Sequence, residues 1–406
     1  MPTSGDIATQ PMTFDTLVVG KGLIGSATAK HLSLSQTRLA IVGPDEPAEG
    51  DRPLVYASHY DSGRVQRLLG HNDAMTDLNL RSANHYPWLE RESGIRFHCG
   101  VGCLYVHPEG IDDYLAAAPA KTANLGIRAT FYRNQQELAS AFPDFRFPPA
   151  AQGLFEGAPS GYLNPRQLLR AQLRVFEKNG GSIFRETVTG IEVAADWVTV
   201  RTNTSATFRA KKVVIAAGAF SNFNTLLDRR LDLAAKSETI ILARVGGAEV
   251  ARLAGLPSLL YEVDVPELEG IYATPPLQYP DGQYYLKLGC NLPEDVYFGK
   301  DLEPVRRWFV EGDSDRHAPK MLAALRTLIP TLAVDGWVTK RCLLPRTTGH
   351  GNPYLGQVND RVYLAAGNGW SAMCSDGAGQ LMAGLVTSGR FPEGINPEDF
   401  EPLFAP

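Results

Sequence analysis

Short apolar runs alternate with helical segments along the chain, and the clearest case lies near the start. Residues 16–19 form an apolar run that ends at Gly20, and residues 38–42 form a second run. Each predicts a buried strand. Between them the segment GKGLIG, with Gly20, Gly22 and Gly25, leads into a helical stretch. This order within about thirty residues predicts a βαβ unit.

The same pattern continues along the rest of the chain. Asn164 and Pro165 are typical of a helix start, and the glycines at 180 and 181 of a helix stop. Residues 51–72 are polar, which predicts an active-site loop or irregular helix rather than core. Residues 143–160 are predicted to form a segment where the chain crosses from one lobe to the other. Further helices are expected at 76–94, 163–178 and 377–387, and strands at 182–184, 188–193, 197–201, 213–218, 239–245, 283–288 and 362–367.

The glycine turn indicates a phosphate-binding loop. Gly20 permits a tight turn, Gly22 lets the backbone approach a pyrophosphate, and Gly25 allows close packing of helix on strand. The alternative is a purely structural turn, but the βαβ context favours dinucleotide binding.

One expected feature of such a site is missing. The acid that normally ends the second strand and binds a ribose is replaced by Gly43. We expect Asp45 or Glu46 to take this role, and the alternative is that both lie on a solvated turn. No arginine stands there to indicate a 2′-phosphate.

Composition narrows the function classes. The 406 residues carry 39 Lys and Arg against 44 Asp and Glu, a net charge of −5, which argues against a nucleic-acid partner. The length fits two or three domains of about 150 residues each. No apolar run is long enough for a membrane span, and residues 1–12 read as a loose tail. The five scattered cysteines suit a reducing, cytoplasmic setting. Cys99 and Cys103 lack a second ligand pair, so we expect no metal.

Four segments in order carry a family resemblance: GKGLIG, GYLNPRQLLRAQLRVFEKNGG, KKVVIAAGAFSN and VYLAAGNGWSAMCSDGAGQLMAGLV. The chain after about residue 15 resembles the D-amino-acid oxidase superfamily of flavoproteins, and within it the branch of monomeric sarcosine oxidase and N-methyl-amino-acid oxidases. The resemblance implies FAD. It also implies an α/β fold in which a Rossmann-like FAD-binding domain is interleaved with an α+β substrate domain built on a mixed antiparallel sheet. We expect residues 13–88, 155–225 and 337–392 in the first domain, and 89–154 and 226–336 in the second.

The resemblance assigns roles to three cations. Arg67 in SGRVQR would bind the substrate carboxylate, for which a guanidinium offers a planar fork, and Arg64 would lie close to the flavin ring. Without the resemblance, this pair would suit a solvated helix face. Lys287 in YYLKLG alone suggests an exposed strand lysine. By the resemblance it is the lysine that activates O₂, because a buried cation stabilises the charge of the forming superoxide.

Cys342, in RCLLPRT, is similar to the cysteine through which this family bonds covalently to flavin, and the neighbouring Arg341 would favour its thiolate. The alternative is an unmodified buried cysteine. Beyond the glycine turn and Cys342, we expect the cofactor to contact Leu23, Ile24, Asp45, Arg64, Val188, Ala217, Gly218, Gly367, Asn368 and Gly369.

The substrate pocket departs from the sarcosine oxidase pattern. Met373 or Cys374 stands where a lysine helps the arginine hold the carboxylate, and Asn291 stands in place of a histidine. Trp370 could form one wall of the pocket, and Tyr272 matches a tyrosine that lines the pocket in this family. We therefore expect a substrate that is larger or less acidic than sarcosine.

The sequence thus predicts an FAD-dependent amine oxidase that forms an imine and reduces O₂ to hydrogen peroxide, as a monomer or small homo-oligomer with no membrane partner. No general base stands out in the matched motifs. The alternatives are a dehydrogenase that passes electrons to a quinone or carrier protein, an FAD-binding subunit of a larger oxidase, and an NAD-dependent dehydrogenase.

Overall fold

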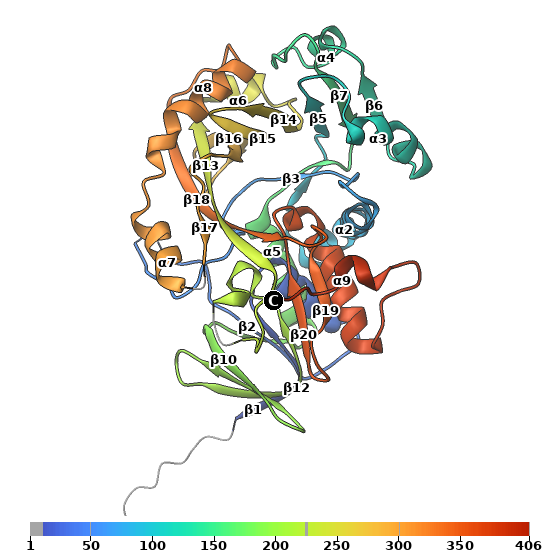
Figure 1. Ribbon diagram of the computed structural model, residues 1–406, viewed down its shortest axis with the longest axis vertical. Helices are drawn as coiled ribbons and strands as arrows, with labels where there is room; N and C mark the ends of the chain where they lie inside the picture. The colour runs from blue at the N-terminus through green and yellow to red at the C-terminus, as the bar shows by residue number, and fades with distance from the viewer. Residues whose placement is uncertain (1–10, 49, 224–225, 300, 406) are drawn as a thin grey trace, which may run out of the picture.

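The computed structural model describes residues 11–48, 50–223, 226–299 and 301–405. Within these residues the strands form three sheets, of eight, nine and three strands. Figure 1 shows the first sheet in the lower part of the molecule and the second in the upper part. The arrangement confirms the predicted α/β class with a second, mixed antiparallel sheet.

The eight-stranded sheet has a parallel centre. β1 pairs in parallel with β2 on one side and β12 on the other, and β20 continues from β12. In this register Val19 lies opposite Ile215, which lies opposite Leu364. The three glycine-rich turns of the sequence therefore meet at one edge of the sheet. Its strands are β1 (Met12–Val19), β2 (Leu39–Val42), β9 (Ser182–Phe184), β10 (Val188–Val193), β11 (Val198–Thr202), β12 (Thr207–Ile215), β19 (Tyr354–Gln357) and β20 (Val362–Ala366).

Four helices pack together beside this sheet: α1 (Leu23–Leu32), α2 (Asp73–Ser93), α5 (Pro165–Lys178) and α9 (Ser371–Ser388). The side chain of Asn164 accepts from the backbone N–H of Gln167 and caps α5, as predicted. Gly379 lets α9 approach α1 closely, because a Cβ there would lie 2.4 Å from that of Ala27.

A buried polar cluster joins three of these helices. Lys30 of α1 pairs with Asp376 of α9, and His85 of α2 lies 2.6 Å from the same carboxylate. His31 completes the cluster, and burial lowers its pKa to about 4. Because the Lys30 ammonium already neutralises Asp376, we assign this cluster a structural role.

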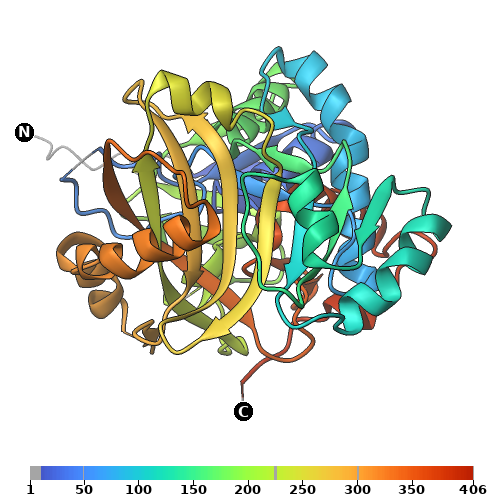
Figure 2. The ribbon, with the colours of Figure 1, turned by 90° about the horizontal axis from the view of Figure 1, so that it is seen from above.

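The nine-stranded sheet builds the second half. Its longest pairing joins β13 and β18 in antiparallel register over their whole length. Seen from above in Figure 2, α8 lies across its strands. The strands are β5 (Cys103–His107), β6 (Ala129–Tyr132), β7 (Gln152–Glu156), β13 (Leu233–Arg244), β14 (Ser258–Val265), β15 (Leu268–Gln278), β16 (Tyr284–Asn291), β17 (Tyr297–Phe298) and β18 (Gly336–Thr347). The other helices are α3 (Asp113–Asn124), α4 (Gln135–Ala141), α6 (Gly247–Arg252), α7 (Leu302–Glu311) and α8 (Ala318–Leu328).

Several limits differ from those that the sequence predicts. The predicted domain limits at 88 and 154 lie within α2 and β7, and the limit at 336 is the first residue of β18; the division into two domains stays a prediction. α9 begins at Ser371 rather than 377, and the added residues of its first turns, Ser371 to Asp376, are mostly buried. Met12 begins β1 instead of ending a tail, while residues 1–10 of that tail lie outside the described residues.

Residues 51–72 also differ from expectation. They contain β3 (Arg64–Gln66), which pairs with β8 (Gly161–Leu163), and β8 in turn pairs with β4 (His98–Cys99). Leu68 and Leu69 are buried, so the end of this segment is core. Among the described residues, no helix is long and apolar enough to cross a membrane.

Candidate active site

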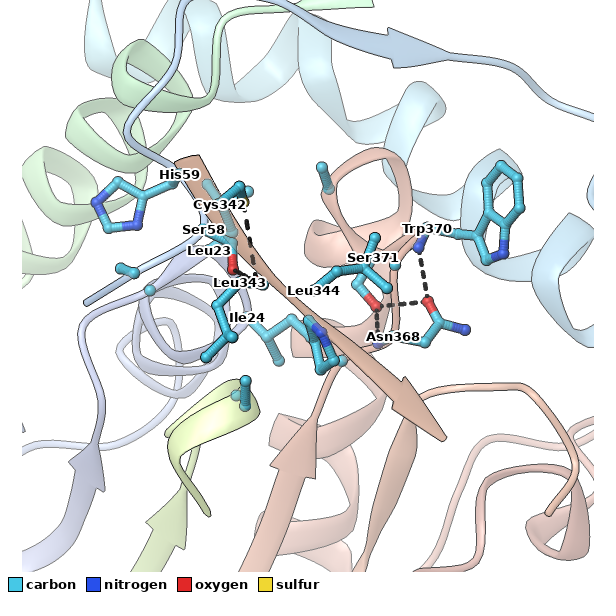
Figure 3. Close-up of a pocket in the computed structure, with 18 of the residues that line it drawn as sticks. Leu23, Ile24, Ser58, His59, Cys342, Leu343, Leu344, Asn368, Trp370 and Ser371 are labelled. Atoms are coloured by element: carbon cyan, nitrogen blue, oxygen red, sulfur yellow. Dashed lines mark hydrogen bonds between the residues drawn. The ribbon is translucent and has the colours of Figure 1, made fainter. Parts of the chain in front are cut away.

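A cavity of about 630 Å³ lies between the two large sheets. Its walls come from the β1–α1 turn, the loop of residues 55–60, β13, β15, β18 and the turn before α9. Figure 3 shows Leu23 and Ile24 on one side, Cys342 to Leu344 on β18, and Asn368 to Ser371 on another side. Its size suits an organic ligand, since such pockets typically measure about 300–1,000 Å³.

The first glycine turn lies at one wall of the cavity. Gly20 has φ of +107°, and a Cβ there would lie 2.3 Å from the carbonyl oxygen of Ala216. A Cβ on Gly25 would lie 1.9 Å from the oxygen of Gly20, which explains the close helix packing. A Cβ on Gly22 would meet no atom within 4 Å, and Gly22 lines the cavity. It also precedes α1 without a side-chain cap, which leaves the first N–H groups free to bind an anion.

Most of the predicted cofactor positions lie at this cavity. Gly25 packs behind the turn, and Asp45 lies outside. The predicted residues that line the cavity are Gly20, Gly22, Leu23, Ile24, Arg64, Val188, Ala217, Gly218, Cys342, Gly367, Asn368 and Gly369.

Neither acid proposed for the ribose lines the cavity. Asp45 pairs with Lys21 and with Arg185, and Glu46 pairs with Arg166 at 2.6 Å. The geometry therefore favours the solvated-turn alternative. Gly43 has a steric reason: a Cβ there would lie 2.5 Å from the backbone nitrogen of Lys21.

Lys287 is buried in an ionic cluster rather than exposed on its strand. Its side chain is 1% exposed, and Nζ donates to Asp61 Oδ2 at 2.6 Å and to the carbonyl of Gly63 at 2.8 Å. Arg64 Nη1 lies 2.5 Å from the same carboxylate oxygen. Burial lowers the pKa of Lys287 to about 8; the charge of Arg64 adds to this effect and Asp61 opposes it.

Asp61 balances these two cations. Burial alone would raise its pKa, but the charges of Lys287 and Arg64 outweigh burial and hold the pKa well below its usual value. Tyr279 donates a further hydrogen bond to Asp61 at 2.8 Å. No motif in the sequence indicated Asp61, apart from its place in the predicted loop.

Cys342 lines the cavity beside Arg64, whose Nη2 lies 3.7 Å from Sγ. The expected partner, Arg341, points away and binds Ser314 and the carbonyl of Phe309. Burial raises the pKa of Cys342, and the charge of Arg64 opposes that rise. The arginine that favours the thiolate is thus Arg64.

Arg67 is buried among three aromatic rings. Its guanidinium carbon lies 5.9 Å from the ring centroid of Tyr105, 5.0 Å from Tyr114 and 5.5 Å from Trp370. Nε and Nη1 have no hydrogen-bond partner among the described residues, although the residue is only 5% exposed. Arg67 does not itself line the cavity, but Trp370 does. A buried donor pair without an acceptor is costly, so it indicates an anionic ligand.

The remaining predicted pocket residues, Tyr272, Asn291, Trp370 and Met373, all line the cavity. The Tyr272 ring lies 5.2 Å from Lys287 Nζ, and its hydroxyl donates to Glu238 at 2.7 Å. Glu238 also lines the cavity, and no sequence motif pointed to it. Its segment LAAKSETIILAR indicates only a strand.

His59 is a second cavity residue that the motifs did not single out. Burial lowers its pKa to about 3, and the charge of Arg166 acts in the same direction, so the ring is neutral. The neighbouring Ser58 hydroxyl donates to the carbonyl of Leu343 at 2.8 Å and ties the loop to β18 (Figure 3).

Comparison with known families decides the class of protein. The family model described as DAO, FAD dependent oxidoreductase, matches residues 15–385. The chain belongs to this family. It is therefore an FAD-dependent oxidoreductase, and the predicted enzyme class and cofactor are confirmed.

Individual relatives of this FAD-dependent oxidoreductase are distant. The chain is 23% identical to monomeric sarcosine oxidase of Bacillus sp. (strain NS-129) over 94% of its own length and 95% of the relative. It is 25% identical to N-methyl-L-tryptophan oxidase of Yersinia pestis (strain Pestoides F) over 52% and 54%. In fold it is similar to NikD, described as an unusual amino acid oxidase, with a TM-score of 0.77 and 20% identity over 97% and 98% of the two chains.

The residues of the cavity fit FAD. The uncapped start of α1 and the open space at Gly22 suit a pyrophosphate. Gly218, with φ of +56°, lines the same cavity, and a Cβ there would likewise meet no atom within 4 Å. Cys342 and Arg64, from β18 and β3, line the same cavity.

Two glycine variants should separate folding from FAD binding. Gly22→Ala should fold normally but bind FAD more weakly, because its methyl group meets only the cavity. Gly25→Ala should lower the melting temperature as well, because its Cβ would overlap the oxygen of Gly20. The measurements are FAD content after purification and thermal unfolding. Equal melting temperatures of the two variants would contradict this assignment.

Proposed function

We propose that the protein is an amine oxidase that converts the C–N bond of a secondary amine or amino-acid-like substrate to an imine, with O₂ reduced to hydrogen peroxide. The observation that carries this proposal is the burial of Lys287 next to the cavity-lining ring of Tyr272. FAD, when bound, supplies the two-electron redox chemistry of such a reaction. The imine then hydrolyses in water.

The chain's own residues supply binding and electrostatics. Arg67 would bind the substrate carboxylate through the donors that the fold leaves unpaired. Trp370 packs on that guanidinium, and Tyr272 forms another part of the cavity wall. Lys287, held in place by Asp61, would stabilise the negative charge that develops on O₂.

The substrate is proposed to be larger than sarcosine. Met373 is only 5% exposed and lines the cavity in place of a second cation, so the carboxylate would be held by Arg67 without a partner lysine. Asn291 accepts from Lys236 at 3.1 Å and is not an acid-base group. Apolar and aromatic contact must therefore supply binding energy that sarcosine cannot provide.

An amine panel with peroxide detection tests this proposal. We expect N-methyl amino acids with bulky side chains to exceed sarcosine in kcat/KM by about 10-fold or more, which corresponds to about 1.4 kcal/mol of transition-state binding. Brisk turnover of sarcosine would contradict the pocket argument. If none of the amines in a broad panel yielded peroxide, the proposed function would be contradicted.

Covalent attachment of the flavin through Cys342 is a further proposal. It is supported by the position of Sγ at the cavity wall next to Arg64. After acid denaturation we expect the yellow colour to stay in the protein pellet, and we expect Cys342→Ala to release it to the supernatant. Cys374→Ala, which removes a fully buried thiol in α9, is the matched control and should keep the colour in the pellet. Release of colour from the wild-type protein would rule out the bond.

A further inference from the structure

A buried ionic network lies behind one wall of the cavity. Lys236 Nζ lies 3.0 Å from Glu238 Oε2 and 2.6 Å from Asp295 Oδ2. The three side chains are 3%, 5% and 6% exposed. Burial lowers the pKa of Lys236, but the two carboxylates outweigh this effect and raise it, so the ammonium is charged. Lys236 and Glu238 are two residues apart on β13 and share one face of the strand.

The network carries one more carboxylate than ammonium. An excess charge is expensive to bury without a compensating cation. Glu238 is the member that lines the cavity, so the excess faces the space that a ligand would fill. A carboxylate offers about four acceptor sites. Among the described residues, Glu238 accepts from Lys236 and from the Tyr272 hydroxyl.

Glu238 is also placed where the reaction would occur. In the antiparallel pairing of β13 and β18 it lies directly opposite Cys342, and Tyr272 links it to the face that carries Lys287. A cation also lies close to this cavity, because Trp370 lines it and packs on Arg67, which does not line the cavity itself but has two unpaired donors. A carboxylate at the wall and a guanidinium behind that wall together match a zwitterion.

We propose that Glu238 is a subsite for the protonated amine of a zwitterionic amino acid, and that Lys236 and Asp295 are positioning residues that hold it there. The subsite rests on the proposed function and specifies its substrate class as an α-ammonium carboxylate. Two other acids at the cavity are weaker candidates, because Glu269 is exposed and Glu262 is half-buried, where water screens their charge.

A pair of inert, nearly isosteric probes tests the subsite. Trimethylammonioacetate and 3,3-dimethylbutanoate share a carboxylate and a trimethyl group but differ in a positive nitrogen against a neutral carbon. Neither has an amine lone pair to oxidise, so binding to the FAD-loaded enzyme is measured by calorimetry without turnover. We expect the wild-type protein to bind the cationic probe more tightly by about 10-fold or more.

The variant Glu238→Gln should bind the two probes about equally, because it should lose affinity for the cationic probe and keep its affinity for the neutral-carbon probe. Asp295→Asn should lower the preference in the same direction, because it removes the excess charge behind Glu238. Glu249→Gln removes another buried carboxylate, one that pairs with Arg252 away from the cavity, and should keep the wild-type ratio. FAD content and melting temperature confirm that each variant is folded.

The outcomes separate this inference from the proposed function. Equal binding of both probes by the wild-type protein, or a preference that persists in Glu238→Gln, would overturn the ammonium subsite alone. A wild-type protein that binds neither probe would overturn the carboxylate site at Arg67 and the subsite with it.

Discussion

Replacing Lys287 with Met is expected to slow the reaction of the reduced enzyme with O₂ by about 10²–10³-fold, the usual cost of removing one preorganised electrostatic group. The ammonium is 1% exposed, so water cannot replace its charge. The variant should fold, because Asp61 keeps Arg64 as a partner at 2.5 Å. The measurement is stopped-flow mixing of the pre-reduced protein with oxygenated buffer. Lys121→Met, which removes an exposed lysine paired with Asp73, is the control.

The pH dependence of the rate with O₂ tests the role of the Lys287 charge without a mutation. Because the pKa of Lys287 is lowered to about 8, the ammonium is protonated below that pH and neutral above it. The oxygen reaction of the wild-type protein should therefore be fast below pH 8 and fall as the pH rises through it. The Lys287→Met variant should lack this step. An unchanged oxygen rate in that variant would assign the oxygen chemistry to another group.

Replacing Arg67 with Leu is expected to cost about 2–5 kcal/mol of binding to a carboxylate substrate, as for other buried charge pairs. This corresponds to a fall in kcat/KM of about 30-fold to several thousandfold. The cost is large because, among the described residues, no other arginine has buried side-chain donors without a partner. The substrate should be compared with its analogue that lacks the carboxylate, for which kcat/KM should change little.

The control for this variant is Arg185→Leu. Arg185 is 67% exposed and pairs with Asp45 outside the cavity, so its loss should leave both substrates unaffected. If Arg67→Leu impaired the two members of the substrate pair equally, Arg67 would have a structural role among its three aromatic neighbours instead of a role in carboxylate binding.

Local sequence signals predicted the part of the site that depends on the backbone. GKGLIG has glycines at the positions where a Cβ would meet Ala216 or the oxygen of Gly20, and such contacts leave a strict pattern in the sequence. The cap at Asn164 is equally local. The contact of Gly25 with Gly20 and the cap at Asn164 involve residues only a few positions apart, so a single sequence shows them.

Groups that act through long-range contacts were harder to predict. Asp61 meets Lys287 across 226 positions in the chain, and Glu238 meets Tyr272 across 34. Their own segments show only a polar loop and a strand with charges at alternate positions, which is also typical of a solvated strand. The pairing of β13 with β18 makes that strand buried, and no local pattern indicates this pairing.

The resemblance located Lys287, Arg67 and Cys342 but did not identify their partners. Adjacency in sequence alone paired Cys342 with Arg341, whereas side chains that are adjacent on a strand point to opposite faces. The structure brings Arg64 to the sulfur instead. Asp45 illustrates the same limit, because its ion-pair partners Lys21 and Arg185 come from other segments of the chain.

One two-step measurement tests the central claim most directly. The purified yellow protein is mixed without oxygen with a bulky N-methyl amino acid, and air is then admitted while flavin absorbance and peroxide are followed. We predict that the amine bleaches the flavin, that air restores the colour faster than it does for free reduced flavin, and that one peroxide forms per amine oxidised. Reoxidation no faster than that of free flavin would contradict the account and indicate a dehydrogenase.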